Sequence, residues 1–196
     1  MKICLFFGSF NPIHIGHLII ANHVISLTES KKVWFIVSPN NPLKQSHTLL
    51  NEYNRLYLVR LAIQGDLNFV ALDIEFKLPK PSYTIDTLTY IKEKYKQHDF
   101  AILIGSDSYK NLSKWKNYDQ LIRENEMIVY KRPGFEVDIH ENKIKILKEA
   151  PYLDISATYI RKMLQEGKSI KYLVTDLVME EIEKSGYYKN NKGIGV

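Results

Sequence analysis

The chain has 196 residues, which is enough for one domain with a sizeable core. Its composition, 45% hydrophobic and 25% charged, is that of an ordinary globular protein. No run approaches the ~18 apolar residues of a membrane span, and the single cysteine, Cys4, excludes a disulfide framework. We therefore expect a cytoplasmic protein. The net charge of +5 fits an anionic small molecule and weak nucleic-acid binding equally well.

Short apolar runs alternate with helical patterns along most of the chain. We predict strands over Lys2–Phe7, Val33–Val37, Phe69–Phe76, Phe100–Gly105, Met127–Lys131 and Lys143–Lys148. The first, second and fourth runs are nearly continuous in apolar residues, which is typical of parallel strands buried on both faces. In the third run Asp73 and Glu75 alternate with apolar residues, which predicts one wetter face.

Helical spacing of apolar residues fills the intervals between these runs. It predicts helices over Ile15–Leu27, over Asn51–Gln64 and from a capping Thr84 to about Gln97. The apolar stripe of the second helix comprises Tyr53, Leu56, Tyr57 and Leu61. This alternation predicts an α/β fold: a doubly wound, Rossmann-like parallel sheet of about five to six strands, with ligands beyond the carboxyl ends of the strands.

The C-terminal part lacks the strand alternation. Ser156 is a candidate cap for a helix that Gly167 ends, and Thr175 for another that Gly186 ends. We therefore expect a nucleotide-binding core over residues 1–150, a small helical lobe over 151–188 that completes a phosphate site, and a flexible tail over 189–196.

The loop after the first strand is the most informative stretch. Gly8 and Gly16 let a backbone and a ligand approach each other at the start of a helix, where free N–H groups favour phosphate. His14 and His17, three residues apart, project from one side of the first turn and can stabilise charge on phosphate oxygens. Two histidines near a helix start can also be merely solvated, but a zinc-protease site is excluded because it needs i, i+4 spacing.

A second candidate phosphate site lies where the C-terminal lobe begins. Ser156 as N-cap leaves nearby amides free, and Arg161 offers a planar cationic fork for phosphate oxygens. Taken alone, this is also the pattern of a capped helix with a surface arginine.

Both stretches resemble motifs of one family. Residues 8–18 resemble the G-[ST]-F-[DN]-P-x-H-x-G-H-L signature of the HxGH nucleotidyltransferases, and residues 155–161 resemble their I-S-S-T-x-I-R motif, with Ala157 in place of a serine and Phe7 where many members have glycine. The resemblance implies catalytic roles for His14, His17 and Arg161. It implies ATP contacts for Gly8, Ser9, Phe10, His14, Gly16, His17, Gly105, Asp107, Ser156, Thr158 and Arg161.

Further stretches resemble the nicotinate-nucleotide adenylyltransferases within that superfamily. Residues 38–44 resemble a Pro-rich loop that ends in Pro-His-Lys, with Leu43 in place of the histidine, and residues 82–88 resemble an S-Y-T-x-D-T-L helix start whose free N–H groups would accept a pyridine carboxylate. Asp107 would bind a ribose, and Trp115 would stack on the pyridine ring. The substrate contacts implied are Asn40, Lys44, Ser82, Tyr83, Thr84, Trp115 and Arg132.

The expected reaction is transfer of AMP from ATP to nicotinic acid mononucleotide, with release of pyrophosphate. The attacking phosphate is already anionic, so no general base is required, and Mg²⁺ would enter on the triphosphate without a protein metal site. Two alternatives stay open: a nucleotidyltransferase for nicotinamide mononucleotide, phosphopantetheine or a sugar-alcohol phosphate, and a noncatalytic nucleotide or RNA binder. The second rests on the basic and aromatic stretch Lys110, Lys114, Lys116, Tyr109, Trp115 and Tyr118. A membrane partner is not expected, and a homo-oligomer is compatible with the sequence.

Overall fold

The computed structural model describes residues 1–39, 49–132, 134–135, 143–147, 151 and 154–189. Its centre is a six-stranded sheet in the order β3-β2-β1-β4-β5-β6, with every neighbouring pair parallel. The strands are β1 (Lys2–Gly8), β2 (Lys32–Val37), β3 (Phe69–Leu72), β4 (Asp99–Gly105), β5 (Glu126–Tyr130) and β6 (Ile144–Leu147). The chain reverses its direction of travel across the sheet between β1 and β4, which is the switch point where doubly wound folds bind ligands.

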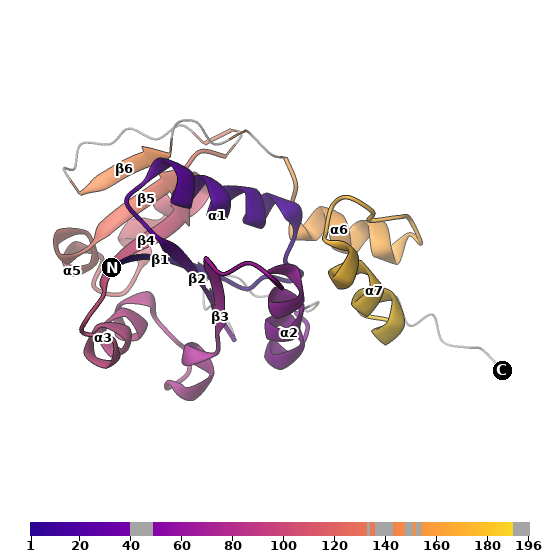
Figure 1. Ribbon diagram of the computed structural model, residues 1–196, viewed down its shortest axis with the longest axis horizontal. Helices are drawn as coiled ribbons and strands as arrows, with labels where there is room; N and C mark the ends of the chain where they lie inside the picture. The colour runs from indigo at the N-terminus through magenta and orange to yellow at the C-terminus, as the bar shows by residue number, and fades with distance from the viewer. Residues whose placement is uncertain (40–48, 133, 136–142, 148–150, 152–153, 190–196) are drawn as a thin grey trace.

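Helices cover both faces of the sheet (Figure 1). On one face lie α1 (Ile15–Leu27) and α2 (Glu52–Ala62), and on the other α3 (Thr84–Lys94) and α5 (Tyr118–Glu124). Each face has its own apolar core, because successive strand residues point to opposite sides. Cys4 and Phe6 pack with α1, whereas Ile3 and Leu5 pack with α3. The predicted doubly wound fold is confirmed.

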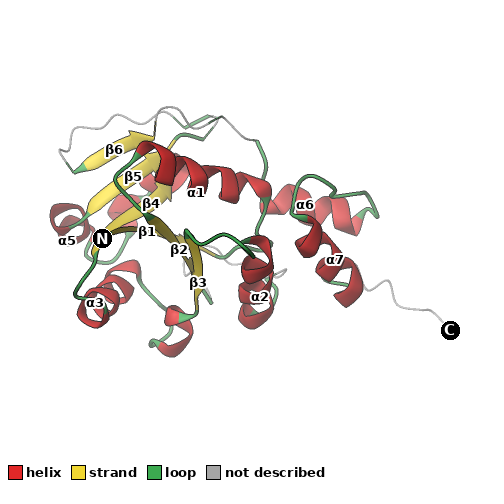
Figure 2. Cartoon of the chain, viewed as in Figure 1, coloured by secondary structure: helices red, strands yellow, loops and turns green. Residues whose placement is uncertain are grey.

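Short helical segments follow two of the strands, as the red segments of Figure 2 show. The 3-10 helix η1 (Ile74–Lys77) follows β3, and α4 (Ser106–Tyr109) and η2 (Leu112–Lys114) follow β4. The prediction of one strand over 69–76 is therefore wrong in its second half. Glu75 is not on a wet face but 3% exposed, because its carboxylate turns inward to the hydroxyls of Ser82 and Thr87.

Helix α2 buries a different stripe from the one its apolar residues suggest. Tyr53 and Tyr57 are exposed, and the buried face instead includes Arg55 and Leu58. An arginine can occupy this face because its head group reaches backbone carbonyls of neighbouring loops. The expected cap of α3 also shifts by one residue: Tyr83 is the N-cap and Thr84 the first helical residue.

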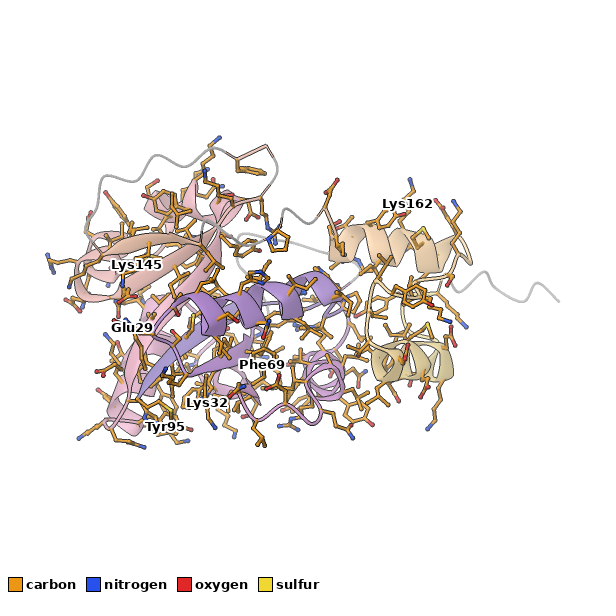
Figure 3. The ribbon with its side chains drawn as sticks, turned by 45° about the horizontal axis from the view of Figure 1, so that its top comes forward. Glu29, Lys32, Phe69, Tyr95, Lys145 and Lys162 are labelled. Atoms are coloured by element: carbon orange, nitrogen blue, oxygen red, sulfur yellow. The ribbon has the colours of Figure 1, made fainter. Side chains whose placement is uncertain are left out.

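The C-terminal helices α6 (Ala157–Gln165) and α7 (Asp176–Ser185) pack beside α1 and α2 at one end of the sheet (Figure 1). Ile160, Val178 and Ile182 belong to the same buried cluster as α1 and α2. The exposed side chain of Lys162 lies on the outer side of α6, far from Glu29 and Lys145 at the opposite end of the molecule (Figure 3). The predicted tail lies mostly outside the described residues.

Among the helices that the structure describes, none is long and apolar enough to cross a membrane.

Candidate active site

A cavity of about 730 Å³ opens at the carboxyl ends of β1 and β4. Fifteen of the eighteen residues predicted for the site line this cavity. The predicted residues that line it are Gly8, Ser9, Phe10, His14, His17, Ser82, Tyr83, Thr84, Gly105, Asp107, Trp115, Arg132, Ser156, Thr158 and Arg161. Gly16 is not among the lining residues, and Asn40 and Lys44 lie outside the described residues.

The two histidines form a stacked pair at the start of α1. Their ring centroids lie 3.7 Å apart, and the backbone N–H of His14 donates to Nδ1 of His17 at 3.2 Å. Since Nδ1 of His17 accepts a hydrogen bond, the proton of its neutral ring lies on Nε2. Nδ1 of His14 is buried without a hydrogen-bond partner in the described structure. The pair therefore offers a neutral donor and an unsatisfied polar atom beside the cavity.

Burial lowers the pKa of both rings. Desolvation, with a smaller contribution from the charge of Arg132, lowers the pKa of His14 to about 3. Desolvation also holds the pKa of His17 well below its ordinary value, and the neighbouring His14 and Arg132 add to the effect. Both imidazoles are thus neutral in the free protein at pH 7, which suits hydrogen-bond donation rather than a fixed positive charge.

The depressed pKa of His14 predicts a loss of stability in mild acid. Below pH 6.5 the unfolded chain protonates this ring while the native state does not until about pH 3, so the unfolded state binds more protons within that window. Lowering the pH from 6.5 to 5.5 should reduce the free energy of unfolding by roughly 1 kcal/mol through His14 alone. Urea titrations at the two pH values measure this, and the His14→Gln variant should show a correspondingly smaller change; an equal change in both proteins would contradict it.

Two amides of the first turn of α1 already have acceptors. The N–H of Ile15 donates to the carbonyl of Leu173 at 2.9 Å, and the N–H of His17 to the carbonyl of His14 at 2.9 Å. These two amides are therefore paired within the protein, and the phosphate contact expected at this helix start does not rest on them. A Cβ at Gly16 would lie 3.0 Å from Nδ1 of His14, so glycine here makes room for the histidine ring.

A similar reason applies to Gly8. A Cβ there would lie 2.8 Å from the ring of Phe10, whose own φ of 45° is left-handed. Phe10 packs against Phe6 and His17, with ring centroids 5.5 Å and 5.1 Å away. The glycine thus accommodates the aromatic ring that supports His17, and the ligand approach expected at Gly8 is not needed to explain it.

The C-terminal lobe reaches the histidine loop through Arg161. Its guanidinium donates to the carbonyl of Asn11 at 2.7 Å and to the hydroxyl of Thr158 at 3.2 Å. Ser156 caps α6 by accepting from the N–H of Tyr159 at 3.2 Å. The predicted cap at Ser156 is therefore present, and its hydroxyl is oriented toward its own helix.

A second arginine of the cavity lining, Arg132, follows the end of β5. The guanidinium of Arg132 donates to the hydroxyl of Tyr130 at 2.6 and 2.9 Å and lies 3.4 Å from the carboxylate of Asp107. Its backbone N–H donates to the Ser106 hydroxyl at 2.9 Å. Arg132 and Asp107 are thus held together beside Gly105, at the end of β4.

Residues 82–84 line the same cavity, as does Trp115, and are hereafter called the acceptor loop because the family resemblance implies that they contact the acceptor. A salt bridge of 2.8 Å joins Lys116 to Asp86, and the ammonium lies 4.9 Å from the centre of the Tyr83 ring. These contacts hold the segment that carries Trp115 against the start of α3. The structure therefore brings together, in one cavity, motifs that lie far apart in the sequence.

Two buried charged residues beside the cavity were missed by sequence reasoning. Arg55 is fully buried and donates to the carbonyls of Leu50, Ser9, Ser38 and Pro39 at 2.7, 2.5, 2.8 and 2.9 Å. Glu75 lines the cavity wall. The pattern of apolar residues in this helix predicts that Tyr53 and Tyr57 face inward, and this prediction leaves Arg55 outside the buried face.

Comparisons with known proteins identify the family of this chain. A family model described as cytidylyltransferase-like matches residues 5–163. A protein of Cytophaga hutchinsonii, named a probable nicotinate-nucleotide adenylyltransferase, is 50% identical over 97% of this chain and 100% of its own length. One of Flavobacterium johnsoniae with the same name is 44% identical over 96% of this chain and all of its own.

Solved structures share the fold. A Plasmodium falciparum nicotinic acid mononucleotide adenylyltransferase in complex with APC superposes with a TM-score of 0.79 at 22% identity, covering 95% of this chain and 96% of that one. The same protein in complex with NaAD gives a TM-score of 0.77. From the sequence relatives, which match over nearly their whole length, the chain belongs to the nicotinate-nucleotide adenylyltransferase family.

Proposed function

We propose that this enzyme transfers the adenylyl group of ATP to nicotinic acid mononucleotide, giving nicotinic acid adenine dinucleotide and pyrophosphate. The observation that carries the proposal is that one cavity joins the histidine pair and Arg161 to the acceptor loop and Trp115. The sequence relatives bear the name of this activity, which favours it over the other nucleotidyltransferases.

The reaction is an in-line displacement. An anionic oxygen of the acceptor's phosphate attacks the α-phosphorus of ATP, the new P–O bond forms, and the bond to the pyrophosphate oxygen breaks. The nucleophile carries no proton that must be removed, so positioning and electrostatic stabilisation supply the catalysis. We expect ATP to enter as its Mg²⁺ complex, with phosphate oxygens and water as the main ligands of the ion.

His17 and Arg161 are expected to contact different phosphates of ATP. The Nε2 proton of His17 is a donor for an α-phosphate oxygen, and the guanidinium of Arg161 is a planar fork for the β- and γ-phosphates. Asp107 lies 3.4 Å from Arg132, and we expect its carboxylate to accept a hydrogen bond from a ribose hydroxyl. Because the imidazoles are neutral before binding, the site avoids the cost of two buried like charges 3.7 Å apart.

The acceptor loop favours a carboxylate over a carboxamide. Tyr83 and Thr84 open α3, where amides lack intrahelical acceptors and the helix dipole is positive. Two amide donors suit a pyridine carboxylate, whereas the NH₂ of nicotinamide would place a donor against a donor. Trp115, partly buried at the cavity wall, offers a flat surface for the ring. Because the donor is ATP, we expect the reaction to occur in the cytoplasm.

The RNA-binding alternative finds little support in the basic stretch. Lys116 pairs with Asp86, and the ammonium of Lys110 lies 5.5 Å from the centre of the Phe135 ring. Lys114 lines the cavity. These lysines therefore serve local contacts and the cavity, which is a poor arrangement for tracking a nucleic-acid backbone.

The test is pyrophosphate release from MgATP with nicotinic acid mononucleotide, nicotinamide mononucleotide or phosphopantetheine as the acceptor. We expect release with the acid mononucleotide to be about 5- to 150-fold faster than with its amide, since the mismatched donor costs about 1–3 kcal/mol. Preference for phosphopantetheine would refute the acceptor assignment. Binding of ATP without release from any acceptor would favour the noncatalytic alternative.

A further inference from the structure

A buried carboxylate lies beside the acceptor loop and takes no part in the proposed chemistry. Glu75, 3% exposed, accepts hydrogen bonds from the hydroxyls of Ser82 at 2.9 Å and Thr87 at 3.0 Å. Burial raises the pKa of Glu75 above its ordinary value, and the neighbouring hydroxyls of Ser38, Ser82 and Thr87 oppose that rise. A charged group is rarely buried without such partners, so this cluster is a built feature of the fold.

The two donating hydroxyls come from either side of the amides of Tyr83 and Thr84. Ser82 is its first residue, and Thr87 lies in the first turn of α3, where its hydroxyl is also 3.2 Å from the carbonyl of Tyr83. Glu75 therefore holds the chain on both sides of the Tyr83 and Thr84 amides. A hydroxyl has one proton, so the one that Ser82 donates to Glu75 is not available for a ligand.

We propose that Glu75 is a positioning residue that determines acceptor specificity: by anchoring Ser82 and Thr87 it holds the amides of Tyr83 and Thr84 where they accept a pyridine carboxylate. The identity of the acceptor rests on the proposed function. Ser82, which the family resemblance assigns to substrate contact, acts in this arrangement through Glu75 rather than on the ligand.

Hydrogen exchange tests the positioning without any substrate. Glu75→Gln preserves the shape of the side chain but replaces one acceptor oxygen with an NH₂ donor. Because Ser82 and Thr87 donate to different oxygens of Glu75, one of the two hydroxyls then loses its acceptor. We expect the amides of residues 82–88 to exchange about tenfold faster in this variant. Asp73→Asn is the matched control, because that carboxylate lies beside the same turn but pairs with Lys77 at the surface. Equal exchange in the two variants overturns the proposal.

Steady-state kinetics tests the consequence for specificity. Glu75→Gln should raise KM for nicotinic acid mononucleotide about tenfold, leave KM for ATP within about twofold, and reduce the preference for acid over amide. Adding Ser82→Ala to this variant should cost little more, because both changes break the same contact. A lower kcat with both KM values unchanged, or fully additive losses, contradicts a positioning role.

The experiments distinguish failure of the proposed function from failure of the role proposed for Glu75. If wild-type enzyme does not use the acid mononucleotide, the proposed function fails, and the exchange experiment still decides whether Glu75 orders the acceptor loop. If Glu75→Gln does not fold, Ser82→Ala and Thr87→Val each remove one donor from the carboxylate and undergo the same two measurements. Unchanged exchange and unchanged KM in both of these variants would overturn the proposal.

Discussion

Replacing His17 with alanine should lower kcat by about 10²–10³-fold, with far smaller changes in either KM. The variant loses the Nε2–H donor whose orientation the His14 backbone fixes, and loss of one such donor to a developing oxyanion costs about 3–4 kcal/mol in the transition state. Pyrophosphate release at saturating substrates measures the effect. The loss concerns the transition state because ATP keeps its contacts with other groups in the ground state.

His23→Ala is the matched control for this experiment. His23 lies on the same helix, and its ring nitrogen contacts the carbonyl of Ile19 at 2.9 Å, outside the cavity lining. Its replacement should leave kcat within about twofold. Near-normal turnover by His17→Ala would remove the histidine pair from the mechanism, whatever the acceptor proves to be.

Replacing Arg55 with methionine should reduce the free energy of unfolding by about 4 kcal/mol. Methionine fills much of the same space, but it leaves the buried carbonyls of Ser9, Ser38, Pro39 and Leu50 without their donor. For a chain of this length the loss corresponds to a Tm lower by about 10 °C. Thermal and denaturant unfolding both measure it.

Arg60→Met provides the comparison, because Arg60 is an exposed residue on the same helix. That variant should lose less than about 0.5 kcal/mol. If the two variants were equally stable, the four carbonyls would not depend on Arg55 as their hydrogen-bond donor, and the expected role of Arg55 in stability would be wrong.

The fold was predictable because its signal is local. Strands buried on both faces need continuous apolar runs, and β1, β2 and β4 have them. The helix ends at Gly167 and Gly186, where φ is +67° and +66°, follow from the glycines themselves. Where a segment's structure depends on distant partners, the pattern misled: residues 73–76 alternate like a strand, yet hydrogen bonds to residues seven and twelve positions later stabilise a turn.

The site also contains residues that the sequence predicts and residues that it does not. The histidine loop and the start of α6 were found because each motif is contiguous, and its residue types carry the chemistry on their own. Arg55 and Glu75 were not, because their roles exist only once the chain has folded: Arg55 contacts Ser9, 46 residues earlier, and a buried charge looks like a surface charge in a sequence.

The phosphate side of the cavity is assembled from the two ends of the chain. Leu173 accepts from the N–H of Ile15, and Arg161 contacts Asn11 across 150 positions. A ribosome synthesises residues 8–17 first and the segment with these partners near the end. On the proposed function, newly made protein should therefore not capture ATP until translation is nearly complete.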